Sequence, residues 1–387
     1  MIPLQPSAPV GYRLAAVLCL VCLAASGCNR GASTADAAAA ANSQSSTTAS
    51  DALPGDDQLR KSLDDALDYT FEKRRLDVKD QAAWQIIHGA LAFKRAFLVR
   101  TGDKDVSAVD YVLQGGQMPG WNLARGDTLD EQAGRYGVRA LYEPGTKTGQ
   151  GHYDQWMGYL SDAGLKLDEP ILVEGKPHTI EDYIVQIERD VPRVSNREYT
   201  WTLMALTAFR PTSYEWTASD GQSWSIEKLL EIELEYDIDE SPCGGTHRMY
   251  ALAIARNRHL ASGGKLEGIW KRVDDKIRQE VERAKAAQNT DGSLSAHYFQ
   301  RPGTAPDITE WMASSGHTFE FLAEALNKNQ LEEPWMKRAA AKLCAQFKKT
   351  QPIDVECAKL FHAAHGLVLY REKVFGERTF PATKTAK

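Results

Sequence analysis

The sequence predicts an all-α fold, an (α/α)6 toroid in which six inner helices are ringed by six outer ones. Three observations lead to this prediction. From residue 57 onward, apolar residues recur at helical spacing, whereas the Val/Ile/Thr alternation typical of strands is nearly absent. Helices with one polar face alternate with more apolar helices that are rich in Ala and Gly. This alternation recurs about six times, and such self-similarity indicates a repeat of helical hairpins.

The predicted outer helices are amphipathic, and each is followed by a more apolar helix that we expect inside. The outer helices are expected at 57–74, 127–142, 178–191, 223–236, 267–288 and 332–349. The inner helices are expected at 79–99, 151–164, 198–208, 244–256, 308–327 and 357–371. Thr179 and Asp182 have the spacing of a capping box. An open α-solenoid is the alternative, but it would leave the apolar last helix exposed.

The first 28 residues have the features of an export signal with a lipid attachment site. Arg13 precedes an apolar run of about a dozen residues, which is too short to span a bilayer and suits a signal-peptide core. The run ends in Ala-Ser-Gly-Cys28, which resembles a bacterial lipobox. We therefore expect Cys28 to bear lipid, palmitate included, and to anchor the protein outside the cytoplasm, at the outer membrane or the periplasmic face of a membrane. An ordinary secretory leader cut near the same place is the alternative.

Composition divides the remaining chain into three parts. Residues 29–56 are rich in Ala, Ser and Thr and are expected to form a disordered linker. Residues 57–372 form the predicted toroid domain, and residues 373–387 a flexible tail. The formal net charge is −6 and no basic run occurs, which excludes a nucleic-acid-binding surface. The expected partners are the membrane, through the lipid anchor, and a glycan or other envelope ligand.

Histidines recur near the start of five of the six predicted inner helices. Because the inner helices of a toroid run parallel, their N-terminal ends would converge at one mouth, where helix dipoles favour anions. We therefore expect a polar, histidine-lined pocket, although histidines that merely pack against neighbouring loops are the alternative. The candidate binding residues are His88, His152, His362, His365, Tyr250 and Trp156. The candidate catalytic residues are His247, His317, Asp154 and Glu320.

A metal site is a further hypothesis. Cys243 and His247 are four residues apart, so they share one face of a helix, and His317 or His362 could add a third ligand. Cysteine and histidine are ligands that zinc prefers, so Zn is the possible cofactor. The alternatives for Cys243 are a nucleophilic thiolate beside His247, a buried thiol, and a disulfide with Cys357.

Two resemblances add to these expectations. The segment 288–294, Gln-Asn-Thr-Asp-Gly-Ser-Leu, is similar to the repeat motif of terpenoid cyclases and prenyltransferases, which are α/α toroids. The segment 237–240, Asp-Ile-Asp-Glu, faintly resembles the acidic motif of class II terpenoid cyclases, and a solvated acidic loop is the alternative. Segments 149–156, 241–247, 316–320 and 362–366 together are similar to an uncharacterised family of bacterial lipoproteins. Its members are sometimes named ADP-ribosylation factor-directed GTPase activating protein, a label the sequence does not support because it has no four-cysteine zinc finger.

Taken together, the sequence predicts a membrane-anchored extracytoplasmic lipoprotein with a histidine-lined toroid cavity. The cavity is expected to act on a cell-envelope molecule such as a glycan. A non-catalytic binding or structural lipoprotein is the first alternative. An enzyme like the terpenoid cyclases and prenyltransferases is the second.

Overall fold

The computed structural model describes residues 53–143, 146, 149–195 and 197–380. The predicted signal peptide, the lipidation site Cys28 and nearly all of the predicted linker lie outside these ranges, as do residues 381–387. Within the described ranges, no helix combines the length and the apolar composition needed to cross a membrane.

The structure is mixed α/β, with 54% helix and 13% strand, so the prediction of an all-α (α/α)6 toroid is wrong. The strands form small sheets. The first has the order β1 (Leu76–Asp77), β2 (Leu98–Thr101) and β3 (Lys104–Ser107), with β1 parallel to β2 and β3 antiparallel to it. The others are antiparallel pairs: β4 (Trp121–Asp130) with β5 (Arg135–Tyr142), β6 (Pro170–Val173) with β7 (Lys176–Thr179), and β8 (Glu215–Thr217) with β9 (Ser223–Ser225).

The predicted outer helix 127–142 does not exist, because this segment forms most of the β4–β5 hairpin. Thr128 pairs with Tyr136 across the hairpin, and the guanidinium of Arg125 lies 3.2 Å from the centre of the Tyr136 ring. Gly134 in the connecting turn has a φ of 63°, a conformation that glycine adopts without steric cost. The hairpin packs against helix α5 (Ile180–Asp190), so its tertiary contacts override the local helical pattern.

Every other predicted helical segment contains a helix. The first half of the chain has α1 (Asp56–Lys73), α2 (Ala83–Phe93), α3 (Ala108–Leu113), α4 (Gln155–Leu160) and α5 (Ile180–Asp190). The second half has α6 (Thr200–Phe209), α7 (Ile226–Leu234), α8 (Thr246–Ala261), α9 (Gly268–Ala286), α10 (Ile308–Ala325), α11 (Lys328–Leu331), α12 (Pro334–Thr350) and α13 (Cys357–Phe375). The predicted capping box is confirmed at α5, where the Thr179 hydroxyl accepts from the Asp182 amide at 3.2 Å.

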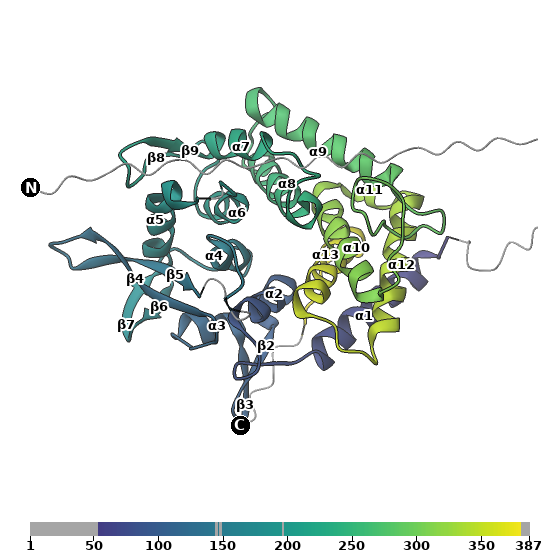
Figure 1. Ribbon diagram of the computed structural model, residues 1–387, viewed down its shortest axis with the longest axis horizontal. Helices are drawn as coiled ribbons and strands as arrows, with labels where there is room; N and C mark the ends of the chain where they lie inside the picture. Colours follow the sequence, from purple (N-terminus) through teal and green to yellow (C-terminus); the bar gives the residue numbers. More distant parts are fainter. Residues whose placement is uncertain (1–52, 144–145, 147–148, 196, 381–387) are drawn as a thin grey trace, which may run out of the picture. The chain divides into compact units, whose positions relative to one another are not determined.

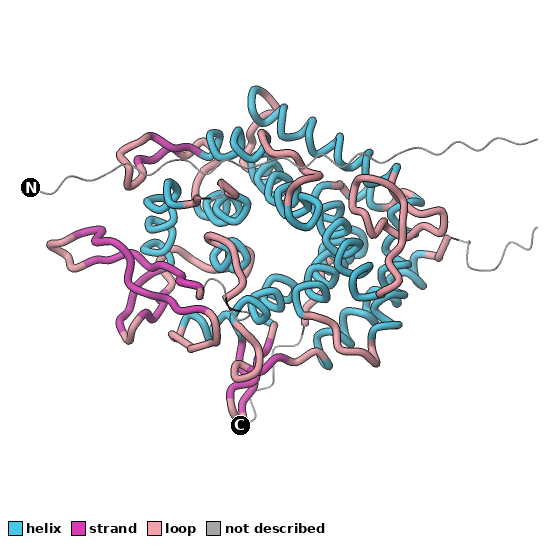
Figure 2. Tube along the Cα trace, in the orientation of Figure 1, coloured by secondary structure: helices cyan, strands magenta, loops and turns pink. Residues whose placement is uncertain are grey.

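Six of these helices contact one another in a closed order. Helix α2 contacts α4, α4 contacts α6, α6 contacts α8, α8 contacts α10, α10 contacts α13, and α13 contacts α2 again (Figure 1). Helices α1, α5, α7, α9 and α12 pack outside them. The β-hairpins lie beyond α2, α4 and α6, whereas helices and loops cover α10 and α13 (Figure 2). The six central helices hold the most buried side chains, because they are covered on all sides.

The closest packing in this set, between α10 and α13, depends on glycine. A Cβ atom at Gly316 would lie 2.6 Å from the Cβ of Ala363, and one at Gly366 would lie 2.9 Å from the backbone nitrogen of Glu320. Any side chain at either position would push the two helices apart. The two glycines therefore set the distance at which Glu320 faces α13.

The chain beyond α13 and the cysteines also differ from expectation. The predicted tail is helical as far as Phe375, and Phe380 packs its ring 4.8 Å from that of Phe93, so the described part of the tail belongs to the fold.

Cys243, Cys344 and Cys357 are free thiols. The disulfide between Cys243 and Cys357, one of the alternatives for Cys243, is therefore not formed.

Candidate metal centre

Five histidines from different parts of the chain lie against one another among the central helices. Their ring centroids are 4.0 Å apart for His317 and His362, 4.9 Å for His88 and His362, 5.0 Å for His247 and His317, and 6.1 Å for His152 and His247. We call these five residues the histidine cluster. The predicted convergence of histidines is therefore observed, but the rings pack on one another, with His88, His317 and His362 at most 5% exposed.

Aromatic side chains complete the walls of the cluster. The His152 ring stacks on Trp201 of α6 at 3.9 Å, so α6 contributes an indole where the other central elements contribute histidines. The Tyr159 ring of α4 lies 5.2 Å from that of His88, and its hydroxyl lies 3.4 Å from Nε2 of His362. The histidine rings are thus enclosed to a large extent by other aromatic rings.

Cys243 reaches the cluster through a left-handed turn. Cys243, Gly244 and Gly245 have φ values of 51°, 61° and 71° immediately before α8. A Cβ atom at Gly244 would lie 2.3 Å from the Tyr298 ring, and one at Gly245 would lie 2.5 Å from Ile238, so only glycine fits at both positions. Cysteine itself is disfavoured in this conformation by about 1–2 kcal/mol. The chain therefore maintains a strained turn that fixes the position of the Cys243 sulfur.

Cys243, His247 and His317 together could hold a metal ion. Each offers one ligand atom, and these three atoms all lie within 4.8 Å of one another. His317 Nδ1 donates to the Ala313 carbonyl at 2.7 Å, which leaves Nε2 as the nitrogen available to a metal. Both ring nitrogens of His247 are buried and have no hydrogen-bond partner among the described residues. Unpaired buried polar atoms are rare in folded proteins, so this imidazole fits the role of a metal ligand.

The electrostatics of the trio are compatible with metal binding. Burial, followed by the charges of His317 and His362, lowers the pKa of His247 well below its usual value, so its ring is neutral at physiological pH. Neutral imidazole is the form that binds metals. For His317, burial acts to lower the pKa, but the hydrogen bond and the charge of Cys243 outweigh it and raise the pKa. The interaction between Cys243 and His317 would also stabilise a Cys243 thiolate beside a His317 imidazolium. A nucleophilic Cys243 is therefore still an alternative to a metal ligand.

Glu320 orients the histidines of α13. Its Oε2 accepts from His362 Nδ1 and its Oε1 accepts from His365 Nδ1, both at 2.7 Å. With Nδ1 donating to Glu320, His362 keeps its lone pair on Nε2, which faces the Tyr159 hydroxyl. Burial, then the charges of His317 and His88, lowers the pKa of His362 well below its usual value, so this lone pair is available at neutral pH. Glu320 therefore influences the site by fixing the ring orientations of His362 and His365.

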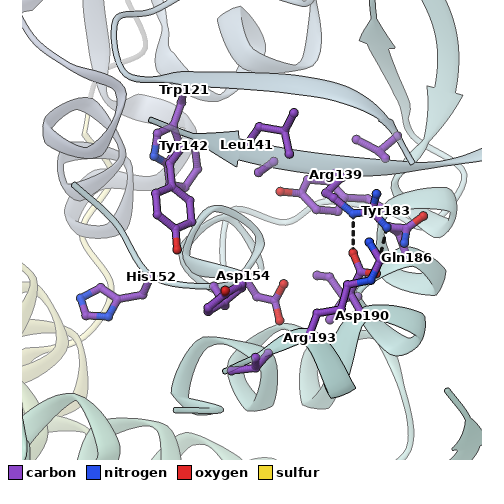
Figure 3. Close-up of a pocket in the computed structure, with 15 residues that line it drawn as sticks. Trp121, Arg139, Leu141, Tyr142, His152, Asp154, Tyr183, Gln186, Asp190 and Arg193 are labelled. Carbon is purple, nitrogen blue, oxygen red and sulfur yellow. Dashed lines mark hydrogen bonds and ion pairs between the residues drawn. The ribbon is translucent and has the colours of Figure 1, made fainter. Parts of the chain in front are cut away.

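A pocket adjoins the histidine cluster at His152 (Figure 3). The pocket has a volume of about 250 Å³ and lies between β5, α5 and the segment before α4. Figure 3 shows His152 at one end and the Arg139–Asp190 ion pair at the other. Asp154 lies between them, accepts a hydrogen bond of 2.6 Å from the Thr202 hydroxyl, and has a φ of 60°. Burial raises the pKa of Asp154 to about 7, as suits a group that exchanges protons at neutral pH.

The remaining predicted site residues lie elsewhere. Tyr250 and His365 form a buried pair with ring centroids 5.8 Å apart, behind the histidine cluster. Trp156 is 3% exposed and packs on Trp121 at 4.4 Å, so it supports the pocket from behind. The acidic motif 237–240 is not part of the site, since Asp239 pairs with Arg283 at the surface.

Sequence reasoning missed Tyr159 and the α5 side of the pocket. Tyr159 falls seven residues after His152 in a predicted inner helix. This helical spacing places both residues on one face and could have indicated that Tyr159 belongs to the site.

Comparisons of the chain with models of protein families, with curated proteins and with solved structures find no match.

Proposed function

We propose that the protein is a lipid-anchored, extracytoplasmic metalloenzyme that binds zinc through Cys243, His247 and His317 and acts on a cell-envelope molecule. The proposal rests on His247, whose two buried ring nitrogens have no partner although the Cys243 and His317 ligand atoms lie within 4.8 Å. An unsatisfied buried polar atom costs about 1–3 kcal/mol. A metal ion bound by His247 would remove part of this cost and would also stabilise the Cys243 thiolate.

The ligand set favours zinc and a catalytic role. A thiolate with two imidazoles is a borderline-soft set of the kind that zinc prefers. Structural zinc sites have four protein ligands, whereas catalytic sites have three and leave a fourth position for water or substrate. Zinc in such a site lowers the pKa of a bound water to about 7 and polarises carbonyl groups.

The surrounding residues supply proton transfer. His362 presents its lone pair on Nε2, and Glu320 fixes the orientation of its ring. Nε2 of His362 can therefore accept a hydrogen bond, and the Tyr159 hydroxyl lies 3.4 Å from it. At the open end, Asp154 with a pKa of about 7 can protonate a leaving group. These roles together suit metal-assisted hydrolysis or group transfer.

The place of action is inferred from the leader and Cys28. An enzyme anchored outside the cytoplasm meets the molecules of the cell envelope, so these are its candidate substrates. Metabolic labelling of cells with an alkyne analogue of palmitate should label the wild-type chain and not the Cys28→Ser variant. Labelling that persists in the variant would contradict the lipid anchor.

The metal is tested by elemental analysis of the protein purified from its full-length chain. The wild type should contain one zinc per chain, and the Cys243→Ser and His317→Ala variants should contain none. Cys357→Ser is the matched control, because it removes a half-buried free thiol from α13 and should retain the zinc. In the cobalt-substituted protein, a thiolate-to-cobalt charge-transfer band should be present in the wild type and absent from Cys243→Ser. Zinc content that is the same in wild type and Cys243→Ser would refute the site.

A further inference from the structure

Three side chains that line the pocket beside His152 have a buried hydrogen-bond donor without an acceptor among the described residues. These donors are Nε1 of Trp121, the hydroxyl of Tyr183 and Nε2 of Gln186. The three side chains are only 4%, 3% and 1% exposed. The amide of Gln186 is held in one orientation, because its Oε1 accepts from the Asp127 backbone nitrogen at 2.7 Å. Its NH2 group is therefore left for another partner.

All three unpaired groups donate, so a molecule that satisfies them must offer acceptors. Each unsatisfied donor costs about 1–3 kcal/mol, and this cost is removed when a ligand oxygen accepts the hydrogen bond. Asp154 adds a carboxyl group that, with a pKa near neutrality, can donate or accept. A ligand that satisfies these groups therefore needs several oxygen atoms.

The charged groups of the pocket are already paired with one another. Arg139 binds Asp190 through Nε at 2.5 Å and through a second nitrogen at 2.9 Å, and it also contacts Asp127 at 3.1 Å. Arg193 lies 3.3 Å from Asp190 and 3.7 Å from Asp127. No side chain in this group is left to balance the charge of an ionic ligand, so the pocket favours a neutral one.

The remaining walls are apolar and aromatic. Tyr142 and Tyr153 are half-buried, with ring centroids 6.2 Å apart and planes at 84°. Leu141, which is 48% exposed, extends this surface outward. Aromatic faces are electron-rich and attract the weakly positive C–H groups of a ring that lies over them. A ligand that combines C–H faces with several neutral oxygens is a saccharide, whereas an isoprenoid would leave all three donors unpaired.

We propose that this pocket binds a neutral saccharide ring, which stacks on Tyr142 and accepts hydrogen bonds from Trp121, Tyr183 and Gln186. The inference names the substrate class of the proposed enzyme and therefore rests on the proposed function. The ring bound there lies next to His152, whose ring centroid is 6.1 Å from that of the metal ligand His247. A cavity of about 250 Å³ takes one ring, with the rest of a glycan outside.

Calorimetric titration of the purified full chain with N,N′-diacetylchitobiose, cellobiose and maltose tests the proposal. At least one of these neutral disaccharides should bind, and Tyr183→Phe should weaken its binding about tenfold, the effect of one lost hydrogen bond. Tyr142→Ala should weaken it as well, because the stacking surface is lost. Tyr69→Phe is the matched control and should bind normally, since its hydroxyl bonds the Gln351 carbonyl away from the pocket.

The outcomes separate this inference from the metal site. Cys243→Ser should lose zinc but keep its affinity for the disaccharide, because Cys243 does not line the pocket. If none of the disaccharides binds while wild-type zinc content is normal, the saccharide assignment is wrong and the metal site stands. Equal affinity of wild type and Tyr183→Phe would also overturn it. Binding of geraniol without binding of any sugar would overturn it in favour of an isoprenoid ligand.

Discussion

Replacing Asp154 by Asn should stabilise the protein, and the gain should grow as the pH rises. The carboxyl group of Asp154 is largely enclosed, and burial raises its pKa from 3.8 to about 7. The asparagine amide removes the charge but keeps the local structure. Its oxygen can still accept from the Thr202 hydroxyl, and asparagine tolerates the left-handed φ of 60° at this position.

The magnitude follows from the pKa. The folded-state pKa lies above the unfolded value, so the protonated carboxyl contributes stability that is fully present below pH 3.8 and is lost as the pH rises through 7. The shift of about three pKa units corresponds to ~4 kcal/mol at 1.36 kcal/mol per unit. The free-energy gap between Asp154→Asn and wild type should therefore be ~3 kcal/mol larger at pH 8 than at pH 5. Because the pocket admits some water, these values are upper limits.

Urea unfolding of both proteins at pH 5, 6, 7 and 8 measures this gap. Effects of acid on the histidines, or on a bound metal, are common to both proteins and cancel in the difference. The exposed Asp168→Asn variant controls for loss of one carboxylate from the chain. A gap that is the same at all four pH values would refute the argument that Asp154 titrates near neutrality, and with it the proton-donor role of this residue.

Two further perturbations test the packing around Glu320. Glu320→Gln leaves one acceptor oxygen for two histidine donors, so it should lower the free energy of unfolding by ~2 kcal/mol, and an unchanged urea midpoint would contradict the double hydrogen bond. Gly316→Ala places a methyl group 2.6 Å from the Cβ of Ala363 and should lower the free energy of unfolding by about 1–3 kcal/mol. In the control Gly55→Ala, the added methyl group has nothing within 4 Å, so the loss measured by thermal unfolding should be less than about 1 kcal/mol.

The sequence predicted the histidine cluster better than the fold class. His88, His247, His317 and His362 were found because each lies in an apolar helix, and the apolar period shows which helices are central. The orientation of the His362 ring could not be read from this period, since it depends on Glu320 and Tyr159, which come from other helices. The closeness of Cys243 to His317 depends likewise on a left-handed turn that no helical spacing implies.

The β4–β5 hairpin shows why the fold class was wrong. Residues 127–142 include Glu131, Gln132, Ala133 and Leu141, which are good helix formers or fit a helical period. The hairpin forms because Gly126 and Gly137 lie against Gln186 of α5, where a Cβ atom on either would be 2.2 Å from its Oε1. This contact joins residues about fifty positions apart, so a local pattern does not contain it. The unpaired donor of Gln186, and with it the chemistry of the pocket, was hidden for the same reason.

The two halves of the site therefore differ in how they are built. The histidine cluster belongs to the central helices, where Gly316 and Gly366 bring α10 and α13 so close that Glu320 can bind two histidines of the neighbouring helix. A change there alters packing and ring orientation at once, so this half tolerates little substitution. The pocket is built by β5, α5 and the loop before α4, which lie outside those helices, so substitutions there change the lining without moving the core. Selectivity for a ligand is thus expected to change through β5 and α5, while Cys243, His247 and His317 keep the same geometry.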